Sequence, residues 1–101
     1  MADTVPSGWT QTGNALTRTI ARADFVDALA LMIEIGRLAE AANHHPDMGV
    51  QGYRKVHISL STHSAGNTVT SKDIELAQQI NDLGDETIRL TYIDLRRRFA
   101  S

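Results

Sequence analysis

The chain has 101 residues, of which 42% are hydrophobic, and its formal net charge is −2 at pH 7. This length predicts a single domain with one modest core, and the near-neutral charge gives no reason to expect nucleic acid or an anionic membrane as a partner. The chain contains no cysteine, which excludes a disulfide framework and a thiolate metal site. No apolar run approaches the ~18 residues that a membrane span needs. Residues 1–7 lack the basic and apolar regions of a signal peptide. The absence of cysteine leaves the compartment open, and the cytoplasm is the default expectation.

The first predicted elements are two short strands joined as a hairpin, over roughly residues 8–12 and 15–22. Threonines stand among apolar residues in both stretches, and residues 12–14 supply the turn. Trp9 is expected to pack in the core, because aromatic rings bury a large area. A role as a ligand wall is the alternative for this residue.

A long helix is predicted from about Phe25 to Asn43, with Asp24 as its N-cap. Its charged residues line one narrow face and are Asp27, Glu34, Arg37 and Glu40. The apolar arc that remains is wider than contact with one sheet requires. Either part of this arc faces another subunit, or the helix is simply well buried on its own sheet.

The predicted helix stops at His44-His45-Pro46. Proline removes an amide donor and pushes the residue before it out of the α region. Two imidazoles are therefore held at a helix C-terminus, where the helix dipole favours their charged form. Histidine titrates near ~6.5, so such a pair can donate or accept a proton at neutral pH. Glu40 precedes His44 by one turn and is expected to orient that ring or to stabilise its charge.

A loop is expected from Asp47 to Gly52, followed by the clearest strand of the chain, Tyr53 to Ser61. Apolar and polar residues alternate strictly along this strand. His63 follows just past its end. An extended chain separates His57 from His63 by ~20 Å, so we do not expect them to serve one site. His57 is predicted to be a solvated or interface residue.

Thr68-Val69 is predicted to add a short fourth strand. The capping-box pattern Thr70-Ser71-Lys72-Asp73 then opens a helix. Capping is a sufficient explanation of Asp73, and we prefer it to direct catalysis.

Gly84 is expected to end this helix. The stretch from Asp85 onward fits either a strand or a helix; its acidic start and its arginine run, Arg96 to Arg98, favour a helix. The arginines are expected to form a solvated face. Residues 84–101 are thus predicted to be a C-terminal extension, of uncertain structure, of a single domain over residues 1–101.

Several of these positions resemble the signature of the pterin-4a-carbinolamine dehydratase family. That signature is an acidic residue, three others, His, His or Asn, and Pro, followed by an aromatic residue, a His and finally an Asp. The matching positions are Glu40, His44, His45, Pro46, Tyr53, His63 and Asp73. The resemblance extends over about Gly8 to Ile80 and includes the strand and helix pattern around the signature.

The resemblance implies an α+β fold with two layers, in which helices pack on one face of a four-stranded antiparallel sheet, and it implies a homodimer or homotetramer. The implied reaction is loss of water from 4a-hydroxytetrahydropterin to give quinonoid dihydropterin, which recycles the cofactor of aromatic amino-acid hydroxylases. This chemistry needs a proton on the leaving oxygen and loss of one from the neighbouring ring nitrogen, so no metal or cofactor is expected and the pterin is the substrate.

By the same resemblance His44, His45 and His63 are the catalytic set. His44 and His63 are the acid/base candidates, and His45 contacts the pterin. Glu40, Pro46 and Asp73 are the expected substrate-binding residues, with Glu40 supporting His44.

Two positions depart from the family pattern. Many relatives carry Asp where this chain has Asn43, and many carry an aromatic residue where it has Met48. Both changes bear on substrate affinity more than on the chemistry.

Three alternatives to the enzyme remain. The first is a non-catalytic assembly or coactivator module of the same fold, although such relatives tend to lose the His-His-Pro motif that this chain keeps. The second is a metal site made of His44, His45 and His63. The third is that the histidines only cap a helix and fill a turn.

Overall fold

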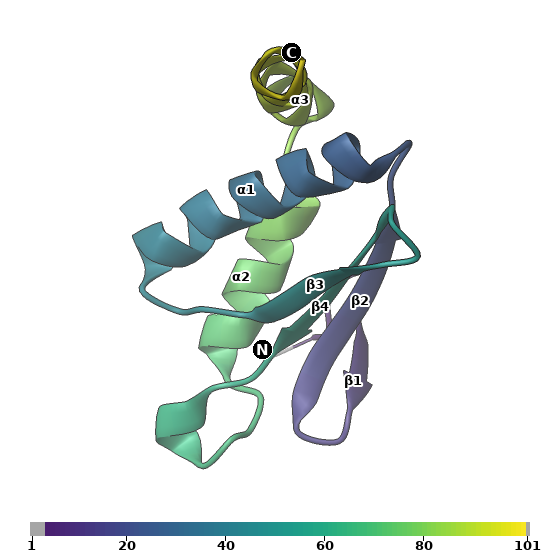
Figure 1. Ribbon diagram of the computed structural model, residues 1–101. Helices are drawn as coiled ribbons and strands as arrows, with labels where there is room; N and C mark the ends of the chain where they lie inside the picture. Colours follow the sequence, from purple (N-terminus) through teal and green to yellow (C-terminus); the bar gives the residue numbers. More distant parts are fainter. Residues whose placement is uncertain (1–3, 101) are drawn as a thin grey trace.

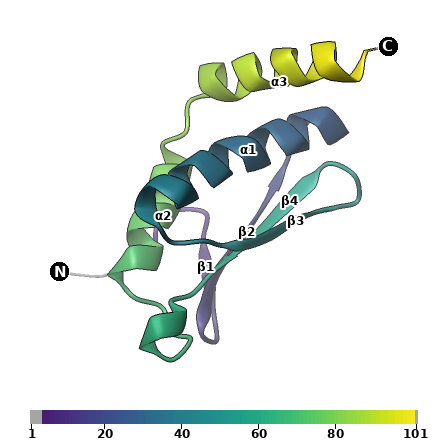
Figure 2. The same ribbon diagram turned by 60° about the vertical axis from the view of Figure 1, so that its left-hand side comes forward.

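The computed structural model describes residues 4–100 and forms an α+β fold (Figures 1 and 2). The elements in chain order are β1 (Thr10–Thr12), β2 (Ala15–Ala21), α1 (Phe25–Ala42), β3 (Asp47–Gln51), β4 (Lys55–Leu60), the 3-10 turn η1 (His63–Ala65), α2 (Ser71–Asn81) and α3 (Asp85–Phe99). The strands form one antiparallel sheet in the order β1-β2-β4-β3, and α1 and α2 cover one of its faces. The predicted fold class is therefore confirmed.

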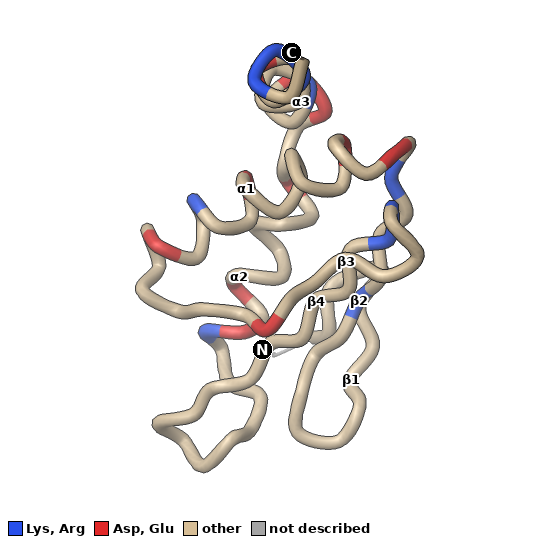
Figure 3. Tube along the Cα trace, in the orientation of Figure 1, with Lys and Arg blue, Asp and Glu red and all other residues tan. Residues whose placement is uncertain are grey.

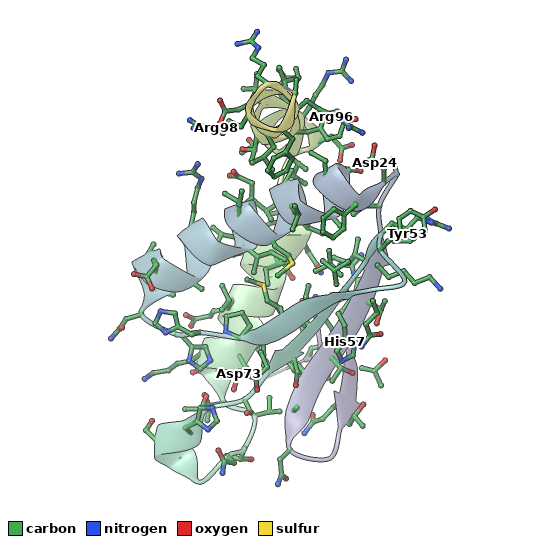
Figure 4. The ribbon with its side chains drawn as sticks, viewed as in Figure 1. Asp24, Tyr53, His57, Asp73, Arg96 and Arg98 are labelled. Atoms are coloured by element: carbon green, nitrogen blue, oxygen red, sulfur yellow. The ribbon has the colours of Figure 1, made fainter. Side chains whose placement is uncertain are left out.

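The centre of the sheet is the pair β2 and β4, and the strict alternation of β4 decides which side is buried. Val56, Ile58 and Leu60 have no exposed surface and face the helices. His57 lies on the opposite face of the sheet, where its Nδ1 is 2.9 Å from Oγ1 of Thr19 across the strand pair. The predicted hairpin and the predicted strand over 53–61 are both confirmed, and His57 is half-buried on the face opposite α1 and α2 (Figure 4).

The loop predicted over Asp47 to Gly52 is wrong, because Asp47–Gln51 forms β3 and pairs with β4. Only Met48 and Val50 alternate in this stretch, and a glycine stands between them, so its own propensity for a strand is low. Pairing with a strong neighbouring strand supplies the stability that the local sequence lacks. The fourth strand predicted at Thr68-Val69 is also wrong, since only one bridge, from Thr62 to Thr68, forms there.

Helix α1 is packed on two sides. One side meets the sheet, and the other meets α3, which lies on the far side of α1 (Figure 1). Ile88 of α3 is 4% exposed, and Oγ1 of Thr91 donates to Oε2 of Glu34, itself 4% exposed, at 2.6 Å. The wide apolar arc of α1 is thus explained by a helix of the same chain, which neither of the two alternatives above anticipated.

The helical interpretation of the stretch after Gly84 is confirmed by α3. Within residues 4–100, no helix is both long enough and apolar enough to cross a membrane. The predictions made for residues 1–3 lie outside the described residues.

Candidate active site

A buried aspartate at the start of α2 is the structural centre of the site. Asp73 has no exposed surface, and its Oδ2 accepts hydrogen bonds from the backbone N–H of Thr70 at 2.8 Å and from Oγ1 of Thr62 at 2.7 Å. The first bond completes the capping box, as predicted. The second comes from a threonine that sequence reasoning overlooked, although it stands directly before His63.

The same carboxylate holds His44. Nε2 of His44 lies 2.6 Å from Oδ1 of Asp73, and the His44 side chain is 12% exposed. Oδ2 of Asp73 accepts two bonds from donors, and Oδ1 accepts a third from Nε2–H of His44. Nδ1 of His44 is then the nitrogen left for proton exchange. Asp73 therefore both caps α2 and orients His44.

A hollow of about 340 Å³ opens beside His44. Its walls come from the end of α1 and one face of α2 and are formed by Ala42, His44, Lys72, Glu75, Leu76 and Gln79. This volume is at the lower end of the range of small-molecule sites. A partly sheltered imidazole thus faces space in which a small molecule fits.

His45 turns the other way. Asn43 ends α1 in the left-handed conformation, with φ 50° and ψ 44°, and Nε2 of His45 lies 2.5 Å from Oε2 of Glu40. The expectation that Glu40 supports His44 is therefore wrong. Helical spacing no longer applies after Ala42, so the ring that returns to Glu40 belongs to the next residue along. This pair is open to solvent, with His45 56% and Glu40 78% exposed.

His63 is the first residue of η1 and is exposed. Its Nδ1 is hydrogen-bonded to Oδ1 of Asn67, which leaves Nε2 for other contacts. The backbone at His63 is tied to the site through Thr62, whose hydroxyl is bonded to Asp73. Each of the three histidines is thus anchored through one nitrogen by a side-chain oxygen.

Three further positions from the comparison with the family pattern are Tyr53, Pro46 and Met48. Tyr53 is 64% exposed in the turn between β3 and β4, at the opposite end of the sheet from Asp73 (Figure 4). Pro46 is half-buried between the histidine pair and β3. Met48 packs against the hydrophobic core. The structure therefore links His44 to Asp73 and places Tyr53 away from them.

A family profile described as "Pterin 4 alpha carbinolamine dehydratase" matches residues 1–83. The chain belongs to this family.

Two relatives are provisionally named as pterin-4-alpha-carbinolamine dehydratases. One, from Roseiflexus castenholzii, is 46% identical over 77 residues, which cover 76% of this chain and 81% of the relative. The other, from Nocardia farcinica, is 44% identical over 75 residues, which cover 74% and 77%.

Two solved structures are similar in fold. A protein from Brucella melitensis, described as a transcriptional coactivator/pterin dehydratase, has a TM-score of 0.68 at 36% identity, over 75% of this chain and 81% of that one. A pterin dehydratase-like protein, described as a RuBisCO assembly factor of the alpha-carboxysome, has a TM-score of 0.57 at 17% identity, over 73% and 83%. The second comparison shows the fold alone.

Helix α3 begins after the last residue that the dehydratase family profile matches. Its attachment to α1 centres on Asp24, the N-cap of α1, whose Oδ1 accepts from the backbone N–H of Asp27 at 2.8 Å. Its Oδ2 accepts from Arg96 at 2.8 Å (Figure 4). The same atom accepts from the Tyr92 hydroxyl at 3.2 Å. The bond from the Asp27 amide, followed by those from Arg96 and Tyr92, lowers the pKa of Asp24, while burial opposes the shift. The bonds to Tyr92 and Asp24 raise the pKa of Arg96.

Metal binding requires several ligands around one point. Across the described residues 4–100, no group of three or more His, Cys, Asp or Glu side chains is arranged to hold a metal ion. His44 and His45 are directed to two different carboxylates, Asp73 and Glu40. The metal-site alternative gains no support from this arrangement.

Proposed function

We propose that this chain catalyses the dehydration of 4a-hydroxytetrahydropterin to quinonoid dihydropterin and thereby recycles the cofactor of aromatic amino-acid hydroxylases. The observation that carries the proposal is the bond from His44 to the buried Asp73, beside a hollow, in a member of the dehydratase family. His44 and His63 are the proposed acid/base groups, and His45 the proposed pterin contact. Glu40 and Pro46 complete the proposed substrate contacts, with Glu40 acting through His45.

The reaction is an elimination without a change of oxidation state. The carbon–oxygen bond at C4a breaks as the hydroxyl receives a proton and leaves as water. The adjacent ring nitrogen loses a proton, and its electron pair forms the new carbon–nitrogen double bond. One group that gives a proton and one that takes a proton are sufficient for this step.

Asp73 supports the role of His44 in two ways. It holds Nε2–H, so that Nδ1 of His44 is the exchanging nitrogen, and its negative charge stabilises the imidazolium that forms when Nδ1 is protonated. Asn67 similarly engages Nδ1 of His63 and leaves Nε2 for the substrate. With the protons held in this way, the protein needs no metal for the reaction. We therefore expect turnover to survive exhaustive chelation, and loss of turnover that zinc restores would contradict this expectation.

The direct test is a turnover assay. The purified chain is added to 4a-hydroxytetrahydropterin generated in situ, and formation of quinonoid dihydropterin is followed by absorbance after subtraction of the uncatalysed rate. We expect a rate proportional to protein concentration that falls strongly in His44→Ala. His57→Ala is the matched control, because that imidazole lies on the opposite face of the sheet. No acceleration by the wild-type chain would overturn the proposal.

The second candidate is an assembly or coactivator module. It is favoured by the description of the structure from Brucella melitensis, which names a transcriptional coactivator beside a pterin dehydratase. The same assay separates the candidates, since this function requires no turnover and no dependence on His44.

A further inference from the structure

Helix α3 has apolar residues on two opposite faces. The inner face packs toward α1 with Ile88, Thr91, Tyr92 and Leu95, all of them buried or half-buried. At 3.6 residues per turn, a second line of residues lies on the opposite side of the helix. We call this line the outer stripe; its members are Glu86, Leu90, Ile93 and Arg97.

The outer stripe is exposed at the edge of the molecule. Leu90 is 59% and Ile93 is 38% exposed, and α3 is the outermost layer, away from the sheet (Figures 1 and 2). Among residues 4–100, Glu86 and Arg97 make no side-chain hydrogen bond or ion pair. The stripe therefore presents two apolar side chains between an unpaired acid and an unpaired base, on a helix that carries both signs of charge (Figure 3).

The spacing of the stripe is self-complementary. Its members are four, three and four residues apart, which is the a/d spacing of a coiled coil. If two copies of α3 lie antiparallel about a two-fold axis between residues 91 and 92, Leu90 lies opposite Ile93 of the second copy. In the same register, Glu86 lies opposite Arg97 of the second copy. Every stripe residue then meets a residue of suitable chemistry.

The opposite orientation is unfavourable. A parallel pair would place Glu86 against Glu86 and Arg97 against Arg97, and like charges at contact distance repel. A two-fold interface uses the same surface patch on both copies, as this stripe requires. Charge thus selects one orientation and one register.

We propose that α3 is a self-association helix that pairs antiparallel with α3 of a second copy of this chain. Leu90 and Ile93 form its apolar centre, and Glu86 and Arg97 of opposite copies form an ion pair at each end. The inner face stays on α1, so pairing requires no rearrangement of the monomer. Because α3 begins after residue 83, this surface lies outside the part of the chain that the family profile matches.

The predicted association is weak. The stripe is about 16 Å long at ~1.5 Å per residue, and it contributes only two apolar layers. An interface of this size falls well below the ~1,200 Å² of stable complexes. We therefore expect a dissociation constant of micromolar or higher, which sedimentation analysis at increasing protein concentration measures.

The decisive experiment mixes two charge variants, Glu86→Lys and Arg97→Glu. Each alone places like charges at both ends of the pair, so each is expected to raise the dissociation constant of this association step at least tenfold. An equimolar mixture pairs Lys with Glu and Arg with Glu, so association is expected to return in the mixture. Recovery on mixing cannot come from a change in the stability of either monomer.

Arg98→Glu is the matched control, because it makes the same charge change one residue away and off the stripe. It is expected to leave association within about twofold of the wild type. Equal association of wild type, both single variants and their mixture would overturn the proposal. The proposal would also be overturned if the wild type showed no concentration-dependent association, or if Leu90→Glu left that association unchanged.

The register is tested by disulfide trapping, which is clean because the chain has no cysteine of its own. A mixture of Glu86→Cys and Arg97→Cys is expected to give mainly the mixed disulfide under mild oxidation. Position 86 of one copy lies about 16 Å along the axis from position 86 of the other, so Glu86→Cys alone is expected to cross-link several-fold less. Equal trapping in both samples would contradict the register.

Discussion

Asp24 and Asp73 perform the same local task in two parts of the molecule, and the two regions differ in what else each aspartate holds. Asp24, the N-cap of α1, accepts the backbone amide of Asp27 in the first turn, whereas Asp73, in the first turn of α2, accepts the amide of the N-cap residue Thr70. Both also bind a side chain from a distant part of the chain. Asp24 binds Arg96 and Tyr92 of α3, at a position where 34% of its own side chain is exposed. Asp73 binds His44 and is fully buried.

The second partner of each aspartate decides whether the capped end of the helix is also part of a site. An arginine stays charged and can only anchor, so the Asp24 region attaches α3. An imidazole held by one nitrogen keeps the other for proton exchange. The Asp73 region therefore combines the geometry of a cap with chemistry that the Asp24 region lacks.

The largest expected effect concerns His63, the proposed acid/base partner of His44. His63→Ala should lower turnover by roughly 10²–10⁴, the usual contribution of one proton-transfer group. Pterin affinity should change less, because His45 is still present, and folding should be near normal for an exposed residue. Steady-state kinetics measure turnover and the apparent affinity for the pterin, and a thermal melt measures folding. Wild-type turnover would remove His63 from the catalytic set, and a failure to fold would show that the ring is structural.

Asp73→Ala tests how much the buried carboxylate contributes to the stability of the fold. It leaves Thr62, the Thr70 amide and His44 without their buried acceptor, so we expect the free energy of unfolding to fall by about 3 kcal/mol. Urea denaturation measures the change. Asp73→Asn is the companion variant, since it keeps much of the cap but removes the charge. In Asp73→Asn we expect the loss of turnover, expressed as activation free energy, to exceed the loss of unfolding free energy. This result would indicate that Asp73 acts on His44.

Asp24→Ala is expected to have a smaller effect, about 1 kcal/mol at pH 7, the usual loss for an N-cap. The lowered pKa of Asp24 gives this contribution a pH dependence. A depressed carboxyl pKa stabilises the fold above the ordinary pKa of ~3.9, and the stabilisation is lost as the pH falls further. The difference in unfolding free energy between wild type and variant should therefore shrink between pH 5 and pH 3. A constant difference would show that charge does not contribute.

Glu40→Gln is expected to have the smallest effect of the set. The pair of Glu40 and His45 is largely exposed, so its loss should change the free energy of unfolding by less than about 1 kcal/mol. Turnover should fall less than about tenfold, because this carboxylate only positions the His45 ring. A decrease in turnover comparable to that of Asp73→Asn would show that Glu40 contributes to turnover as much as Asp73 does.

Local patterns in the sequence predict most of the fold. The alternation of β4, the N-cap Asp24 and the capping box that ends in Asp73 all appear in the structure where the sequence places them. The strand β3 was missed because its pairing, and not its composition, makes it a strand. The covering of α1 by α3 was missed for a similar reason, since it depends on contacts between distant segments.

The candidate site is predictable in its members but not in its pairings. The signature names His44 and Asp73, yet they are 29 residues apart and no local rule joins them. The left-handed backbone at Asn43 decides which histidine meets which carboxylate. Asparagine tolerates this conformation better than most residues, so its presence here suits the turn.

The outward position of α3 also affects how the molecule moves through a solvent. The chain measures 48 × 26 × 23 Å, and its radius of gyration of 14.0 Å exceeds the ~12.7 Å of a compact domain of this length. An elongated particle has a larger frictional coefficient than a sphere of equal mass. A single chain is therefore expected to leave a gel-filtration column early, at the volume of a heavier compact protein. Elution volume alone would thus overestimate the mass, and the absolute mass from light scattering is the quantity that distinguishes an elongated monomer from a true pair.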